Sequence, residues 1–279
     1  MSGKNQLNGR LPRVILIKGG GDLASGAAHR LYKAGFNLVV TEKEQPTVIR
    51  RPVSFAQAAL AGKAEVEGVT AVRITSVDEI EPAWEKGLIP LLIDPELNGL
   101  PRIEPEVLVE GTMAKKNTGV NCDLASIVIA LGPGYGAGKE VHAVVETARG
   151  HHLGRVIYNG EATPNTGIPG EIEGYSVERV LRAPKAGTFE PRCSIGELVE
   201  KGDTVACIEG EPVLAEIGGV VRGLLYEGLG VKEGMKVGDV DPRGNKELCF
   251  TISDKSRAVA GGVLEAVLHL SRGGGVPSC

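Results

Sequence analysis

The chain of 279 residues has few aromatic side chains and no long apolar run. Phe, Trp and Tyr together make up 4% of it. No stretch approaches the eighteen or so consecutive apolar residues that a membrane span requires. The N-terminus also lacks the ordered basic, apolar and small-residue segments of a secretory signal. These absences predict a cytoplasmic protein with no membrane partner.

Neither sign of charge dominates the sequence. It has 31 Lys and Arg against 35 Asp and Glu, a formal net charge of −4, which gives no electrostatic case for a nucleic-acid partner. The five cysteines are scattered and form no Cys-x-x-Cys pair. Neither a zinc knuckle nor a thioredoxin-like redox pair is therefore indicated, and we expect no metal site.

Glycine, in contrast, is abundant, with 40 residues. The most informative cluster follows the apolar run 14–18 and precedes a helix expected over residues 22–34. Its pattern, Gly19-x-Gly21-x-x-Ala24, is typical of the strand–loop–helix unit that binds nucleotides. Glycine lets backbone amides approach a phosphate, and the start of a helix attracts negative charge. We therefore predict ligand contacts at Gly19, Gly20, Gly21, Asp22 and Leu23.

Two further features extend this predicted site. Glu42 closes the next apolar run, roughly twenty residues beyond the first loop, where a carboxylate accepts hydrogen bonds from ribose hydroxyls. A second glycine-rich loop over residues 131–138 follows another expected strand and offers backbone amides without a helix dipole. It adds Gly132, Gly134 and Gly136 to the candidate contacts. A purely structural turn stays open as the alternative for both loops.

The chain divides into parts that differ in sequence pattern. Short apolar runs alternating with helix-compatible segments predict a parallel α/β sheet in the first part. A stretch rich in glycine and proline over residues 159–174 marks the expected boundary. We expect a Rossmann-like nucleotide-binding α/β domain over residues 10–174, a β domain over 175–252, and a terminal helix with a tail over 253–279.

The expected β domain resembles the hammerhead of biotinyl and lipoyl carriers. Its two halves share a repeated motif, which is Val199-x-x-Gly202-Asp203 in the first half and Val231-x-x-Gly234 in the second. In that family each half closes a small antiparallel sheet, and a lysine at the tip of the central hairpin carries the cofactor. The expected hairpin over residues 209–213 contains no lysine. No covalent biotin or lipoyl is therefore expected, and the module is predicted to be structural or to dock a partner.

Several sequence blocks together resemble one family over nearly the whole chain. They cover residues 18–31, 45–51, 142–147, 154–157, 164–167, 241–244 and 251–255. They resemble the YqeB-type proteins of the selenium-dependent molybdenum hydroxylase maturation system, and the first block is similar to part of the xanthine dehydrogenase accessory factors. The resemblance implies an accessory protein that binds or delivers the molybdenum cofactor, in its dinucleotide or selenium-modified form, to a selenium-dependent molybdenum hydroxylase as partner.

Two other functions stay open. An NAD(P)-dependent oxidoreductase would use the same glycine loop, although the sequence identifies no catalytic residue for it. A non-catalytic scaffold that docks the hydroxylase would need no small ligand. The sequence decides neither whether the protein is an enzyme nor whether it forms a homo-oligomer.

Overall fold

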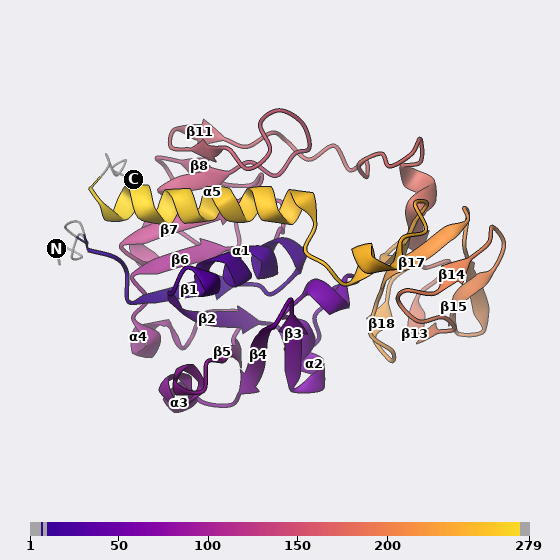
Figure 1. Ribbon diagram of the computed structural model, residues 1–279, viewed down its shortest axis with the longest axis horizontal. Helices are drawn as coiled ribbons and strands as arrows, with labels where there is room; N and C mark the ends of the chain where they lie inside the picture. The colour runs from indigo at the N-terminus through magenta and orange to yellow at the C-terminus, as the bar shows by residue number, and fades with distance from the viewer. Residues whose placement is uncertain (1–6, 8–9, 274–279) are drawn as a thin grey trace.

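The computed structural model describes residue 7 and residues 10–273. The chain forms a larger part with helices on both faces of a sheet, and a smaller part made of strands at one end of it (Figure 1). Within the described residues, no helix combines the length and the apolar character needed to cross a membrane.

A nine-stranded sheet forms the centre of the larger part. Its strands are β1 (Val14–Lys18), β2 (Asn37–Glu42), β3 (Lys63–Val66), β4 (Val69–Ile74), β5 (Ile89–Ile93), β6 (Val107–Glu110), β7 (Ile127–Leu131), β9 (Ala143–Val145) and β10 (Val156–Ile157). Their order is β10-β9-β7-β6-β1-β2-β5-β4-β3. In this order, all the strands between β10 and β3 run parallel to one another. At the two edges, β10 pairs antiparallel with β9, and β3 pairs antiparallel with β4. A short antiparallel pair, β8 (Gly136–Ala137) and β11 (Gly160–Glu161), lies beside them.

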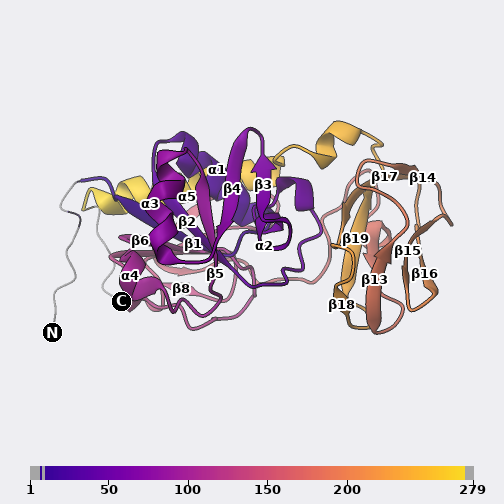
Figure 2. The same cartoon turned by 90° about the horizontal axis from the view of Figure 1, so that it is seen from below.

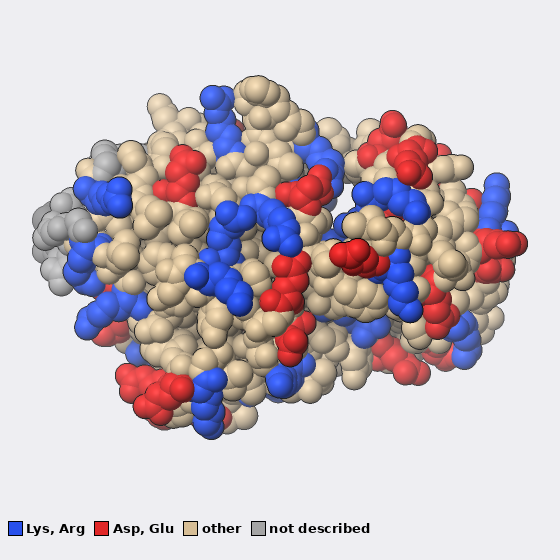
Figure 3. Space-filling view, viewed as in Figure 1, with Lys and Arg blue, Asp and Glu red and all other residues tan. Residues whose placement is uncertain are grey.

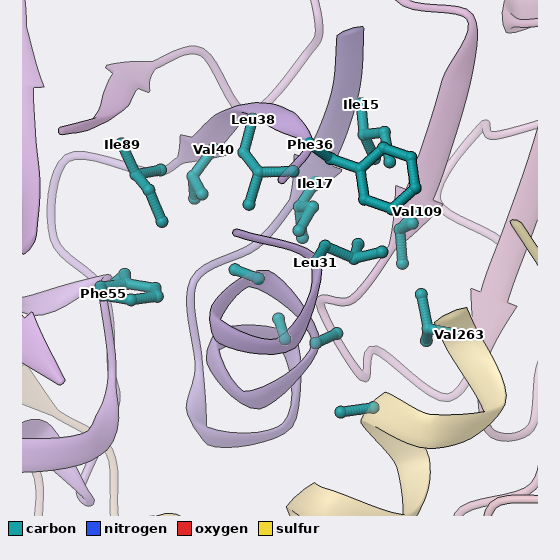
Figure 4. Close-up of a cluster of buried hydrophobic side chains, with 14 of the residues drawn as sticks. Ile15, Ile17, Leu31, Phe36, Leu38, Val40, Phe55, Ile89, Val109 and Val263 are labelled. Carbon is teal, nitrogen blue, oxygen red and sulfur yellow. The ribbon is translucent and has the colours of Figure 1, made fainter. Parts of the chain in front are cut away.

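In the described part of the chain, five α-helices cover the two faces of this sheet. They are α1 (Asp22–Lys33), α2 (Gln57–Ala61), α3 (Ile80–Glu85), α4 (Leu100–Ile103) and α5 (Asp254–Ser271). Side chains alternate across a strand, so Ile15 and Ile17 pack against α1, α2 and α5, whereas Leu16 faces the core that contains residues of α3 and α4. Figure 4 shows Leu31 of α1 and Val263 of α5 directed toward the strand side chains of the first core.

Helices α1 and α5 approach each other closely and begin at the same end of the sheet (Figure 1). Ser256 Oγ donates a hydrogen bond of 3.0 Å to the carbonyl oxygen of Asp22. A side chain at Gly26 would overlap Ser256 Oγ, and one at Gly262 would overlap the backbone of Gly154. Small residues at these positions therefore set how closely the helices pack on each other and on the sheet.

The smaller part contains eight strands and a core of its own. The strands are β12 (Val180–Arg182), β13 (Gly187–Pro191), β14 (Leu198–Val199), β15 (Thr204–Ile208), β16 (Glu211–Leu214), β17 (Gly219–Leu224), β18 (Gly230–Val231) and β19 (Lys236–Asp241). They form two antiparallel sheets of order β12-β19-β17-β14 and β16-β15-β13-β18, at the right of Figure 2. Phe189, Val221 and Val240 are fully buried between them.

Short 3-10 turns connect these elements. They cover Arg51–Val53, Val77–Glu79, Cys122–Leu124, Val177–Arg179 and Lys246–Cys249. The first of them helps to join the two parts of the molecule. Arg51 Nε donates to the carbonyl oxygen of Leu224 at 2.8 Å, and the amide of Leu224 donates to the carbonyl oxygen of Ile49 at 2.9 Å.

The predicted Rossmann-like domain is wrong. A Rossmann sheet has the order 3-2-1-4-5-6 and is built from repeated βαβ units. Here β5 is inserted between β2 and β4, and the described chain runs from β6 through β7 to β9 without an α-helix. The apolar runs gave the positions of strands, but periodicity along one strand carries no information about which strand lies next to it.

The predicted hammerhead is also wrong. The resemblance implied that each half of the module closes a sheet of its own. Instead β14 pairs with β17 of the second half, while β13 of the first half pairs with both β15 and β18. The repeated glycines do lie at turns, with positive φ at Gly202 and Gly234. A repeated turn motif fixes where the chain reverses, but it leaves the pairing of the strands undetermined.

Replacing Gly262 by alanine should destabilise the protein by about 1–3 kcal/mol, because the added methyl group meets Gly154 and approaches Val145 Cγ1 to 2.8 Å. Gly261→Ala is the matched control. A methyl group there meets no heavy atom within 4 Å, and should raise stability by up to about 1 kcal/mol through helix propensity. Chemical denaturation of both variants measures the difference, and equal effects would contradict the close packing of α5.

Candidate functional site

A pocket of about 430 Å³ opens at the carboxyl ends of the central strands, and we call it the edge pocket. Strand β1 lies between β2 and β6. The chain enters β2 after α1, which covers one face of the sheet, and enters β6 after α4, which covers the other face. Such a point of divergence leaves a crevice in an open α/β sheet, and ligands bind there. The lining comprises Lys18, Gly19, Gly21, Asp22, Leu23, Thr41, Glu42, Lys43, Pro46, Thr47, Val48, Pro95, Gly111, Thr112 and Met113.

Packing explains the first two glycines of the loop. Gly19 has a φ of +91° and donates its N–H to the carbonyl oxygen of Thr41 at 2.7 Å. A Cβ at Gly20 would lie 2.7 Å from the backbone nitrogen of Ala56. Glycine at these two positions therefore allows the backbone of the loop to turn and to contact its neighbours, whether or not a ligand is bound.

Gly21 has no such structural requirement. Its φ is −69°, and a Cβ there would meet only Val48 Cγ1, at 3.8 Å. It is the N-cap of α1, and no side chain caps the helix. The N–H groups of the first helical turn have no carbonyl partner within the helix. Because Gly21, Asp22 and Leu23 line the pocket, these donors are available beside it.

Glu42 braces the glycine loop. Its Oε2 accepts a hydrogen bond of 2.9 Å from the N–H of Gly20, and its Oε1 accepts one of 2.8 Å from the N–H of Lys43. The side chain still lines the edge pocket, and each carboxylate oxygen retains acceptor capacity. The contact with a ribose stays a prediction, now for a carboxylate already held in place by the loop.

The second glycine loop does not line the edge pocket. A Cβ at Gly132 would lie 2.5 Å from Thr147 Oγ1, and one at Gly134 would lie 2.6 Å from the nitrogen of Lys116. Gly136 donates its N–H to Glu140 Oε2 at 2.8 Å. Close packing therefore accounts for glycine at two of the positions. Their role as ligand contacts stays a prediction, although the intervening Pro133 lines another pocket, of about 510 Å³.

One buried ion pair, which the sequence did not predict, joins Lys18 of the edge-pocket lining to Glu110. Lys18 Nζ lies 3.8 Å from Glu110 Oε2, with 7% and 2% of these residues exposed. Lys18 also donates to Thr118 Oγ1 at 3.1 Å, and that hydroxyl donates to Glu110 Oε2 at 2.7 Å. Tyr135 OH lies 3.0 Å from Thr118 Oγ1. Burial raises the pKa of Tyr135 above its usual value, so the phenol keeps its proton.

Thr41 is a second missed candidate. It lines the pocket from β2 and is 1% exposed, yet its hydroxyl forms no hydrogen bond. A buried polar atom without a partner costs free energy, and native proteins rarely retain one without a reason. Thr41 could have been identified in the sequence as a polar residue near the carboxyl end of an apolar strand. Lys18 and Glu110 occupy the same kind of position.

Among the residues that the structure describes, no group of three or more His, Cys, Asp or Glu side chains is arranged to hold a metal ion. The lining of the edge pocket offers amides, hydroxyls and the charged side chains of Lys18, Asp22, Glu42 and Lys43.

Comparison with known proteins identifies one curated relative. No family model matches the chain. The protein described as "Uncharacterized protein YqeB", from Escherichia coli strain K12, is 48% identical over 262 residues. The alignment covers 94% of this chain and 48% of the relative. The chain therefore spans about half the length of the curated relative that it matches.

Solved structures give only weak similarity. An aspartoacylase family protein from Mesorhizobium loti has a TM-score of 0.26 at 11% identity, with 84% of this chain and 86% of that chain covered. A succinylglutamate desuccinylase/aspartoacylase from Rhodobacter sphaeroides has a TM-score of 0.28 at 16% identity, with the same coverage. Scores this low support no conclusion about fold or activity.

The resemblance to a molybdenum hydroxylase maturation system is corrected by these findings. The relative at 48% identity is described only as uncharacterized. Shared sequence blocks established similarity to the relative, but they carried no physical information about molybdenum, selenium or a client enzyme.

Glu110→Gln should destabilise the protein by about 3 kcal/mol, since it leaves the buried ammonium of Lys18 without its nearest carboxylate. Glu96→Gln is the control, because Glu96 is an exposed acid in the neighbouring loop and its neutralisation should change stability by less than about 0.5 kcal/mol. Urea unfolding compares the two. A similar small effect for both variants would show that Lys18 does not depend on Glu110.

Proposed function

We propose that the edge pocket binds a phosphorylated small molecule with an apolar ring, and that this ligand is a nucleotide or dinucleotide. The volume of about 430 Å³ falls in the range of small-molecule sites. Its lining combines amides and hydroxyls with the apolar surfaces of Leu23, Pro46, Val48, Pro95 and Met113. A nucleotide carries a phosphate that suits the polar groups and a ring that suits the apolar surfaces.

One observation carries the proposal: the uncapped start of α1 opens into this pocket through Gly21. A helix N-terminus presents free N–H groups and a positive dipole end, which together stabilise a phosphate. Lys18 and Lys43 are the cations of the lining, beside the carboxylates of Asp22 and Glu42. The hydroxyl of Thr41, buried and without a partner, supplies a further donor or acceptor for the ligand.

An NAD(P)-dependent oxidoreductase is the second candidate, and the hydrogen-bond network around Lys18 favours it. Such a reaction needs a group that moves a proton as hydride is transferred. Lys18 donates a hydrogen bond to Thr118 Oγ1, and Tyr135 OH lies 3.0 Å from the same hydroxyl oxygen. Oxidation of NADH or NADPH in the presence of a carbonyl substrate would distinguish this function from binding alone.

We also propose a cytoplasmic location. The composition of the chain, with its scattered cysteines and no long apolar run, supports this location.

Binding of nucleoside diphosphates and NAD(P) to the whole protein tests the proposal. A ligand at one hundred times its dissociation constant should stabilise the folded state by about 2.7 kcal/mol. Thr41→Val should weaken binding about fivefold, the loss of one hydrogen bond. It should leave the stability of the free protein unchanged or slightly higher, because the buried hydroxyl is unpaired.

Thr70→Val, in β4 and outside the pocket, is the matched control and should bind as the wild type does. Isothermal titration calorimetry gives the dissociation constants, and thermal unfolding gives the stabilities. Failure of every nucleotide to bind would contradict the proposal and would favour a non-catalytic docking role.

A further inference from the structure

A second pocket, of about 400 Å³, lies where the two parts of the molecule meet, and we call it the junction pocket. Asp22 and Leu23 line it at the start of α1, while Ser253 and Lys255 line it at the start of α5. The smaller part contributes residues of β17 and β19. The junction pocket shares Asp22, Leu23 and Val48 with the edge pocket, so the two adjoin around the beginning of α1.

The lining of the junction pocket is strongly basic, although the whole chain has a net charge of −4. Its two carboxylates are Asp22 and Asp239. Its six cations are Arg50, Arg149, Arg179, Arg222, Lys236 and Lys255. On the face seen in Figure 3, in contrast, acidic and basic side chains are interspersed over both parts of the molecule. The lining of this pocket therefore differs in charge from that face.

The nearby carboxylates do not pair all of these cations. Asp239 Oδ2 lies 3.5 Å from Arg179 and 3.9 Å from Lys236, so one carboxylate is shared at distances beyond a strong hydrogen bond. Asp241 is held by Arg243 at 2.6 Å and stands 3.7 Å from the Nε of Arg222.

Three cations of the lining form no side-chain hydrogen bond. Among the described residues, the side chains of Arg222 and Lys236 form ion pairs only, at 3.7 and 3.9 Å, and that of Lys255 forms neither a hydrogen bond nor an ion pair. The remaining arginines are more fully engaged. Arg149, for example, is bound by both oxygens of Asp254, at 2.7 and 3.1 Å.

Buried donors in this pocket lack acceptors. The Nε atoms of Arg50, Arg179 and Arg222 are buried and form no hydrogen bond. These residues are 6%, 5% and 9% exposed. Loss of solvation lowers the pKa of Lys255 and of Arg222, and neighbouring cations lower both further. Like charges that are brought together without acceptors destabilise one another, and an anion among them would relieve that repulsion.

We propose that the junction pocket binds a phosphate-type oxyanion, held by Arg222, Lys236 and Lys255. A phosphate supplies several acceptor oxygens and negative charge, which are what the unpaired donors lack. The starts of α1 and α5, both on the lining, contribute their positive dipole ends. The proposal rests on this charge arrangement and does not require a nucleotide in the edge pocket.

The phosphate has two possible sources, a free inorganic anion or the phosphoryl end of a ligand that extends from the edge pocket. Titration of the whole protein at low ionic strength with inorganic phosphate, pyrophosphate and ADP separates them. Chloride at matched ionic strength controls for screening. We expect pyrophosphate to bind more tightly than phosphate, because it offers more charge and more acceptors to the same cations.

Lys236→Gln and Lys255→Gln should each weaken pyrophosphate binding about tenfold. Lys232→Gln, an exposed lysine four residues before Lys236 and outside the pocket, should leave it unchanged. Lys236 is 41% exposed in its side chain and Lys255 is only partly buried, so both variants should fold normally. Circular dichroism and thermal unfolding check this directly.

Absence of pyrophosphate binding, or equal affinity in all three variants, would overturn the proposal. If Lys236→Gln weakens ADP and pyrophosphate alike, the anion belongs to a ligand spanning both pockets. If it weakens pyrophosphate alone, the anion is free. Thr41→Val reports the edge pocket independently, since it should impair ADP and spare pyrophosphate. Failure of the nucleotide proposal is therefore distinguishable from failure of this one.

Discussion

The close approach of α1 and α5 is the constraint on which the arrangement of both pockets depends. Small residues at the contact bring the two helices together, and the hydroxyl of Ser256 ties the start of α5 to the carbonyl of Asp22. Both helices therefore begin at the same end of the sheet, beside the smaller part. A bulkier contact would separate their first turns and would disperse the amides and cations that now lie together.

Charge gives the two adjoining pockets different characters. The edge pocket has an apolar wall, an uncapped helix start and one buried ion pair, a combination suited to a ligand with a ring and a phosphate. The junction pocket has cations in excess of its carboxylates.

Arg50 connects the starts of the two helices. It pairs with Asp22 at 3.0 Å and also donates hydrogen bonds to the carbonyl oxygens of Leu248 and Thr251. This one side chain links α1 to the segment that leads into α5.

Local sequence patterns predicted individual elements better than their assembly. The apolar run at residues 14–18 is β1, and the helix expected from residue 22 begins at Asp22. The insertion of β5 between β2 and β4, and the exchange of strands between halves of the smaller part, depend on contacts between distant segments. No local period encodes such contacts. For the same reason the junction pocket was not foreseen: its cations come from Arg50, Arg149, Arg222 and others that are far apart in sequence.

Crystals of the protein grown with pyrophosphate would test the charge arrangement most directly. We predict an anion at the junction pocket, with oxygen atoms within hydrogen-bond distance of Arg222, Lys236 and Lys255. Pyrophosphate bound elsewhere, with these three side chains paired only to carboxylates of the chain, would contradict the account.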